Sequence, residues 1–313
     1  MVLATLQSLP ITDILAWVVI GVFLLGVVAG YRERLLARRI TAGAWAMFAL
    51  FWLLYVPFFV FEHRSIIQAV LALIAVPACL LVGYHLYHGR DSLLVLSKAG
   101  AVMGVIYLPF ETIPLFHNTL IEVVTRQTEL AIQALGYSPD IDYSEDGLRN
   151  IILFHHETGE TFGSIIIFAC TGIGSMAIFG GLIAAVDEPL RRRLGALVFT
   201  IATIWVLNIV RNVFIALSHG MQWWQYDILI GPVMFMFGLN NVNRVSFFFA
   251  DRIVSQALAV VVLVIIFWIV LKLLPSLSII VEDLLYLLTG EEYELDLEGS
   301  DGQPVTAPAV GDD

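Results

Sequence analysis

Residues 164–186 read SIIIFACTGIGSMAIFGGLIAAV, an apolar run that contains no charged side chain. About 20 such residues are needed for a helix to cross the hydrocarbon core of a bilayer, so this stretch predicts a membrane-spanning helix. Its first third is unlike a lipid-facing surface, because Cys170 is followed by the mostly small and polar sequence Thr-Gly-Ile-Gly-Ser at 171–175. Such residues allow the close approach of a substrate backbone or the close packing of helices, and both readings are open.

Similar apolar runs recur along the chain. It has 313 residues, of which 59% are hydrophobic and 14% charged, and its mean hydropathy is +0.88. No soluble domain of this length needs so much apolar surface, which predicts an all-α, polytopic transmembrane bundle of seven to eight spans. The expected spans are residues 14–31, 43–61, 66–87, 93–117, 164–186, 195–217 and 253–274.

One shorter run, Ile228–Leu239, contains Gly231 and Pro232. It is too short to cross a bilayer simply, which predicts a re-entrant or interfacial element that lines the site. Alternatively, it pairs with Val245–Phe249 as a broken eighth span.

The basic residues predict the orientation of the chain. If seven helices alternate in direction, nine of them share one face: Arg32, Arg34, Arg38, Arg39, Arg90, Arg191, Arg192, Arg193 and Lys272. The opposite face carries five: Arg64, Arg126, Arg149, Arg244 and Arg252. By the positive-inside rule the N-terminus is outside and the C-terminus is cytoplasmic. Because Met1–Asp13 has no basic segment, the first run is expected to be a retained helix of a multi-pass cell-membrane protein.

The expected organisation is one transmembrane domain, residues 1–280, followed by an acidic cytoplasmic tail, 281–313. The domain includes one extracellular loop region, about 118–163, with an amphipathic helix at Leu120–Leu135. The tail has acidic residues but no basic ones, and the composition of its end predicts disorder. A net charge of −11 with only two lysines suits a protein kept soluble at high salt, which suggests a haloarchaeal origin. Nucleic-acid binding is not expected, because no basic face exists outside the short cytoplasmic turns.

Three polar side chains are expected at one membrane depth, just below the outer surface. Cys170 and Arg211 each lie about six residues, or roughly 9 Å, below the outer end of their predicted helices, and Arg252 opens the last helix from the same face. Arginine is costly in hydrocarbon, and beside a thiol it favours the reactive thiolate. The pattern predicts a membrane-embedded cysteine nucleophile with its active site near the extracellular face.

Each of these residues has a plainer reading. Lone membrane cysteines are commonly inert apolar filler, as we expect for Cys79. Arg211 can snorkel to the interface, although Asn208 on the same helical face favours the bundle interior. Arg252 can anchor a helix end or pair with Asp251. The sequence contains no disulfide framework and no paired Cys/His spacing, so no metal site and no cofactor are expected.

The segments Ala-Cys-Thr-Gly-Ile at 169–173, Asn-x-x-Arg at 208–211 and the basic residue Arg252 resemble the exosortase/archaeosortase family. The resemblance extends over about residues 14–274. Exosortases have histidine as the third of these residues, and the archaeosortase pattern has arginine. Arg252 therefore removes the obvious general base, a role for which His219 is a candidate.

The resemblance implies a membrane cysteine protease or transpeptidase. Its substrates would be secreted surface proteins, such as S-layer glycoprotein, with a C-terminal Pro-Gly-Phe motif, a transmembrane helix and a basic cluster. The enzyme would remove that helix and attach the new C-terminus to an amine-bearing archaeal lipid. Cys170 would form a thioester, while Arg211 and Arg252 stabilise the thiolate and the oxyanion, supported by Asn208 and Thr171.

Two other functions stay open from the sequence. The first is a transporter or lipid-binding membrane protein whose intramembrane arginines hold an anionic ligand. The second is simple proteolysis without transfer to a lipid.

Overall fold

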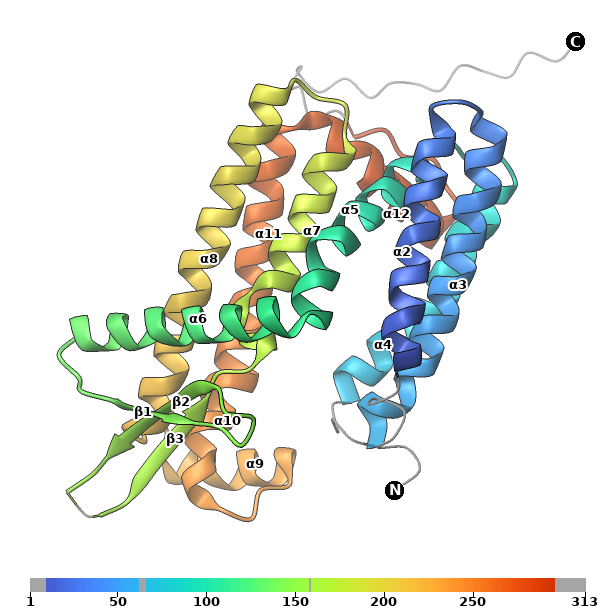
Figure 1. Ribbon diagram of the computed structural model, residues 1–313. Coiled ribbons are helices and arrows are strands. Elements are labelled where there is room, and N and C mark those ends of the chain that lie inside the picture. The colour runs from blue at the N-terminus through green and yellow to red at the C-terminus, as the bar shows by residue number, and fades with distance from the viewer. Residues whose placement is uncertain (1–9, 62–65, 158, 296–313) are drawn as a thin grey trace, which may run out of the picture.

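Four long helices form one lobe of the molecule. A computed structural model gives the structure of residues 10–61, 66–157 and 159–295, and the blue-to-teal helices of Figure 1 are α2 (Pro10–Gly30), α3 (Arg34–Phe61), α4 (Ile66–Tyr87) and α5 (Leu93–Thr112). They pack around an apolar core whose largest fully buried side chains include Phe23, Leu86 and Leu93. All four are long and apolar enough to cross a membrane.

The second lobe contains α7 (Ile173–Ala185), α8 (Leu190–Gly220) and a helical rod from Val242 to Leu273. This rod is made of η2 (Val242–Arg244), α10 (Val245–Phe248), the π-helical η3 (Phe249–Ser255) and α11 (Gln256–Leu273). α5 joins the two lobes because it packs against α7 as well as α2. At Gly181 of α7 a Cβ atom would lie 2.4 Å from the Ala99 carbonyl oxygen, so only glycine permits this approach.

The predicted helical membrane bundle is confirmed, with two corrections to its spans. Six of the described helices are long and apolar enough to cross a membrane. The expected span 164–186 is wrong in its first half, where the chain is a strand and a 3-10 turn and only α7 is α-helical. With 13 residues, α7 is about 20 Å long and is too short to cross alone. The expected span 93–117 ends early, because Pro114 starts a new helix.

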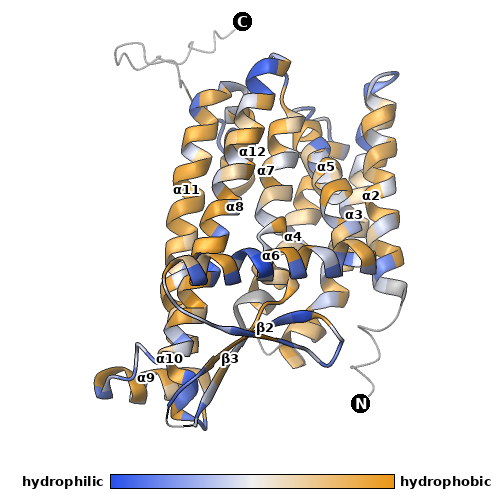
Figure 2. Cartoon of the chain, turned by 60° about the vertical axis from the view of Figure 1, so that its left-hand side comes forward, coloured by the Kyte–Doolittle hydropathy of each residue, from blue (hydrophilic) through white to orange (hydrophobic). Residues whose placement is uncertain are grey.

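That new helix, α6 (Pro114–Ala134), lies across the long helices (Figure 1). It contains the predicted amphipathic segment Leu120–Leu135 except for Leu135, which caps its C-terminal end, and Leu120, Ile121 and Val124 are buried on one face. Figure 2 shows that hydrophilic and hydrophobic residues alternate along α6. Trp205 of α8 donates a hydrogen bond to the Gln127 side chain at 2.8 Å, which ties α6 to the second lobe.

A three-stranded antiparallel sheet follows α6, and the expectation of a purely helical fold missed it. Its order is β1 (Asp140–Tyr143), β2 (Arg149–His155) and β3 (Thr161–Ile165). Alternate residues of β2 are buried, as expected for a strand with one face on the core. The His156 ring nitrogen Nε2 lies 2.6 Å from the Gly220 carbonyl oxygen, so the sheet is fastened to the end of α8.

The short run Ile228–Leu239 forms most of α9 (Asp227–Phe237). In Figure 1 this helix lies near the sheet and across the direction of the long helices, with Ile228 and Phe235 highly exposed. The stretch Val245–Phe249 belongs to the beginning of the last rod. Arg252 therefore lies inside that rod and does not open it, which corrects the expected start at residue 253.

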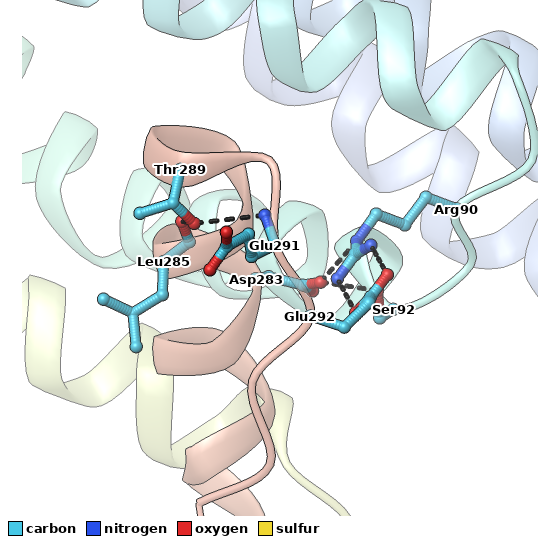
Figure 3. Close-up of polar contacts among 7 residues, drawn as sticks. All are labelled: Arg90, Ser92, Asp283, Leu285, Thr289, Glu291 and Glu292. Atoms are coloured by element: carbon cyan, nitrogen blue, oxygen red, sulfur yellow. Dashed lines mark hydrogen bonds and ion pairs between the residues drawn. The ribbon is translucent and has the colours of Figure 1, made fainter. Parts of the chain in front are cut away.

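The other end of the bundle is closed by α12 (Ser278–Thr289), which packs against α5. Arg90, in the α4–α5 turn, donates hydrogen bonds at 2.7 Å to both Asp283 and Glu292, and Ser92 also bonds to Asp283 (Figure 3). The Glu292 hydrogen bond and the Asp283 contact raise the pKa of Arg90, and the Arg90 hydrogen bond lowers the pKa of the Glu292 carboxyl.

The expected domain boundary at residue 280 falls inside α12, and the end of the acidic tail, for which disorder is expected, lies outside the described residues, which stop at 295. The nine basic residues that predict the cytoplasmic face belong to turns and helix ends at this α12 end: Arg32, Arg34, Arg38, Arg39, Arg90, Arg191, Arg192, Arg193 and Lys272. Of the five expected at the other end, Arg64 lies outside the described residues.

Candidate active site

Cys170 lies in η1 (Phe168–Thr171), a single 3-10 turn between β3 and α7. The position expected from the sequence, a third of the way into a helix, is wrong, because the α-helix begins after the thiol. Gly172 separates the two elements with φ of +77°, a backbone conformation that glycine adopts readily. A Cβ at this position would also lie 3.0 Å from Cγ of Asn208, so the turn packs directly on α8.

Two asparagines of α8 hold the main chain of Cys170. The Nδ2 groups of Asn208 and Asn212 donate to the Cys170 carbonyl oxygen at 2.7 and 2.9 Å. They are four residues apart, which puts both on one face of the helix. Asn208 was expected to support the site, whereas sequence reasoning missed Asn212. The signal that could have found it is the i, i+4 spacing of two amide side chains in an apolar helix.

Arg211 is adjacent to Asn212 on α8 and reaches a different element. Its Nη2 donates to Asp251 Oδ1 at 2.6 Å, and the other carboxylate oxygen, Oδ2, lies 3.2 Å from Nε of Arg252. Asp251 thus lies between the two arginines. Sequence reasoning had considered it only as a partner of Arg252.

Asp251 and Arg252 are adjacent residues in the π-helical turn at Phe249–Ser255. A π-helical turn is wider than an α-helical turn, and such turns occur frequently at functional sites. The segment packs against α8, and α8 also packs against η1. Consequently α8 joins the three segments that the sequence singled out: it bonds to the Cys170 carbonyl through Asn208 and Asn212, and to Asp251 through Arg211.

Aromatic rings enclose the turn that carries the thiol. The Phe168 ring stacks on the His117 ring with centroids 4.6 Å apart, and Tyr107 meets Phe168 edge-on at 5.7 Å. Thr171 is fully buried and its hydroxyl donates to the Phe168 carbonyl at 2.7 Å. The Thr171 side chain therefore closes the 3-10 turn, while Cys170 keeps partial exposure.

His219, the candidate general base, lies in the last turn of α8. Its ring contacts Phe162 and Phe247, and its Nδ1 is 3.4 Å from the Gln222 side chain. It follows Asn212 by seven residues, which is about 10 Å along the helix axis. Among the described residues, no hydrogen bond or ring contact links His219 to Cys170, to the two asparagines or to Arg211.

The second cysteine has different surroundings. Cys79 of α4 is 4% exposed and lies in the apolar core of the first lobe. Within residues 10–61, 66–157 and 159–295, no group of three or more His, Cys, Asp or Glu side chains is arranged to hold a metal ion.

Comparison with known proteins places the chain in a family of transmembrane enzymes. The family model described as transmembrane exosortase matches residues 12–243. The chain is 52% identical over 299 residues to archaeosortase A of Natronomonas pharaonis, which covers 94% of each chain. It is 46% identical over 295 residues to archaeosortase A of Haloferax volcanii, over 91% of this chain and 96% of the relative. Both relatives come from halophiles, in agreement with the acidic composition.

The family match and the matches to the relatives cover different numbers of the candidate site residues. The family model includes Cys170, Asn208 and Arg211 but ends before Asp251 and Arg252, whereas the two relatives match more than nine-tenths of the chain. No solved structure matches this chain.

Proposed function

This chain belongs to the transmembrane exosortase family, whose members are membrane enzymes that process sorting signals, and on that premise we propose that Cys170 is the nucleophile of this enzyme. The proposed substrates are secreted surface proteins, such as S-layer glycoprotein, with a C-terminal signal of a Pro-Gly-Phe motif, a helix and a basic cluster. The proposed acceptor is an amine-bearing archaeal lipid.

In the proposed reaction the Cys170 thiolate attacks the scissile carbonyl carbon. The C–N bond breaks, the departing amine takes a proton, and the new C-terminus stays on the enzyme as a thioester. The lipid amine then attacks the thioester carbonyl, which forms an amide and releases the thiol. Arg211 and Arg252 stabilise the thiolate and the oxyanion that develops in both steps.

One observation carries the proposal: the arrangement of polar groups around α8. Asn208 and Asn212 fix the main chain that carries the thiol, and Arg211 sits between them in sequence and is bound to Asp251. Buried hydrogen-bonding side chains in a membrane bundle mark functional sites, since they are costly there. Side chains of one helix, α8, thus hold the main chain that carries the thiol and supply a fixed guanidinium group, which supports the pre-organisation that acyl transfer requires.

The proposed orientation follows from the two ends of the bundle. The nine basic residues at the α12 end favour the cytoplasm for that end. The sheet, α6 and α9 then lie outside, with Cys170 between the sheet and α7. A short motif preceding a substrate's transmembrane helix would reach the thiol at this level.

The test is the intact mass of a candidate surface protein in cells carrying Cys170→Ala. We expect the C-terminal helix to remain on the substrate, while the matched variant Cys79→Ala processes it normally. Normal maturation with Cys170→Ala would refute the nucleophile assignment. In the wild type, a product mass with the lipid added indicates transfer, and a mass without it indicates hydrolysis.

A further inference from the structure

The Asp251 carboxylate contacts both of the proposed catalytic arginines. Each carboxylate oxygen contacts a different arginine: Oδ1 binds Arg211 from α8, and Oδ2 binds Arg252 from its own segment. The carboxylate side chain is only 14% exposed, less than either arginine at 26% and 39%. It is therefore the inner member of the group.

We propose that Asp251 is a positioning residue, which aligns Arg211 and Arg252 as one pair that acts on the Cys170 thiol or on the oxyanion. The inference rests on the proposed function, because the pair has this purpose only if the arginines act on the thiol or the oxyanion.

Charge explains why the pair needs such a residue. Two guanidinium groups confined in a partly buried layer repel each other, and neither can lose its proton. A carboxylate between them turns that repulsion into attraction and leaves a net charge of +1. Two oxygens in the plane of one carboxylate can accept from two donors at once, which sets the direction of both side chains.

The arrangement leaves most of the donors unused. Arg211 uses Nη2 and Arg252 uses Nε to contact Asp251, and within the described part of the chain neither forms another hydrogen bond or ion pair. Each guanidinium has five N–H groups, so several on each side remain for an oxyanion or a substrate carbonyl. Asp251 thus orients the arginines without saturating them.

The backbone supports the same role. Asp251 and Arg252 are neighbours inside the π-helical η3, and η3 packs against α8. The π-helical turn supplies the carboxylate and the second arginine, Arg252. Helix α8 supplies Arg211 and the two asparagines that bond to the Cys170 carbonyl. A plain fastening of two helices would not require the second arginine.

The proposal predicts that substrate processing falls while alkylation of the Cys170 thiol does not. In Asp251→Asn the shape is kept and the negative charge is lost, so the arginines are misaligned and substrate processing should fall by about 10- to 100-fold. The surroundings of Cys170 become more positive, which favours the thiolate. Alkylation of Cys170 by iodoacetamide at neutral pH, measured in a Cys79→Ala background, should then be unchanged or faster. Asp251→Glu, which keeps the charge, should recover part of the processing.

The controls separate this proposal from the proposed function. Asp227→Asn, at the exposed start of α9, should process and alkylate like the wild type. If Asp251→Asn processes at the wild-type rate while Cys170→Ala is inactive, the positioning role is wrong and the enzyme assignment stands. If processing and alkylation fall together and Asp251→Glu recovers neither, the role is purely structural and the proposal is overturned. If Cys170→Ala still processes, the proposed function itself fails.

Discussion

Two clusters of charged side chains, at different levels of the bundle, have opposite compositions. In the α4–α5 turn one arginine, Arg90, lies between two carboxylates, Asp283 and Glu292 (Figure 3). In η3 one carboxylate, Asp251, lies between two arginines. The first group has an excess of negative charge and the second has an excess of positive charge.

The difference separates a structural contact from a candidate catalytic one. The Arg90 guanidinium donates hydrogen bonds to Asp283 of α12 and to Glu292 in the segment after it. Its guanidinium carbon lies 3.6 Å from the centre of the Tyr286 ring. In that cluster the Arg90 guanidinium is paired with both carboxylates, and Asp283 accepts through Oδ1. Around Asp251 the positive charge exceeds what the carboxylate neutralises, which is costly near lipid and is useful where negative charge develops during a reaction.

The largest expected effect on processing comes from deleting Arg211, the arginine that α8 supplies to the Asp251 cluster. Arg211→Ala should lower the processing rate by about 10²- to 10³-fold, because an oxyanion donor is lost. Arg211→Lys, which keeps the charge and loses the planar fork, should fall between this variant and the wild type. Rates are measured by the appearance of the processed surface protein in a pulse-chase experiment.

The counterpart in the other cluster is Arg90→Ala. It should leave the processing rate per molecule unchanged and lower the free energy of unfolding by about 1 to 3 kcal/mol, because the buried Asp283 loses a charged partner. Thermal unfolding in detergent measures this loss. Equal losses of processing from Arg90→Ala and Arg211→Ala would abolish the distinction between the clusters.

A smaller effect on processing is expected from Asn212, which follows Arg211 and bonds to the Cys170 carbonyl. Asn212→Ala removes one of the two hydrogen bonds to the Cys170 carbonyl and leaves Asn208 in place. A typical hydrogen bond contributes about 1 kcal/mol, so processing should fall roughly five- to tenfold. The exposed Asn240→Ala is the matched control. A loss as large as that of Arg211→Ala would mean that carbonyl positioning, and not charge, dominates the site.

The smallest effect is a pH dependence confined to the Arg90 cluster. Hydrogen bonding to Arg90 lowers the folded-state pKa of Glu292, so this contact stabilises the protein above the ordinary glutamate pKa. The contribution is lost as the pH falls through the lowered folded-state pKa. The melting temperatures of the wild type and Glu292→Gln should therefore differ at neutral pH and converge in acid. A difference that persists at low pH would show that the contact does not depend on the Glu292 charge.

Much of the site could be anticipated from residue types alone. Cysteine, asparagine and arginine are conspicuous in apolar runs because lipid offers them no partners, so Cys170, Asn208, Arg211 and Arg252 were identifiable. Asn212 and Asp251 were harder to recognise. Their importance lies in what they contact, and nothing in a linear sequence states that Asp251 of η3 meets Arg211 of α8.

The local structure around the thiol was the main error. The run 164–186 is apolar throughout, and hydropathy cannot distinguish a helix from a strand followed by a turn when both are buried. The three-stranded sheet was missed for a similar reason, since its strands are short and the alternation in β2 extends over only seven residues.

The amino-acid sequence by itself determined that the chain is a membrane bundle and on which end its basic residues lie, because apolar length and charge act locally and do not depend on partners. Only the tertiary structure decided that α7 is a short helix behind a 3-10 turn, that two asparagines hold the Cys170 carbonyl, and that Asp251 lies between two arginines. These features depend on directional contacts between segments about 40 residues apart, and such contacts form only when the helices pack.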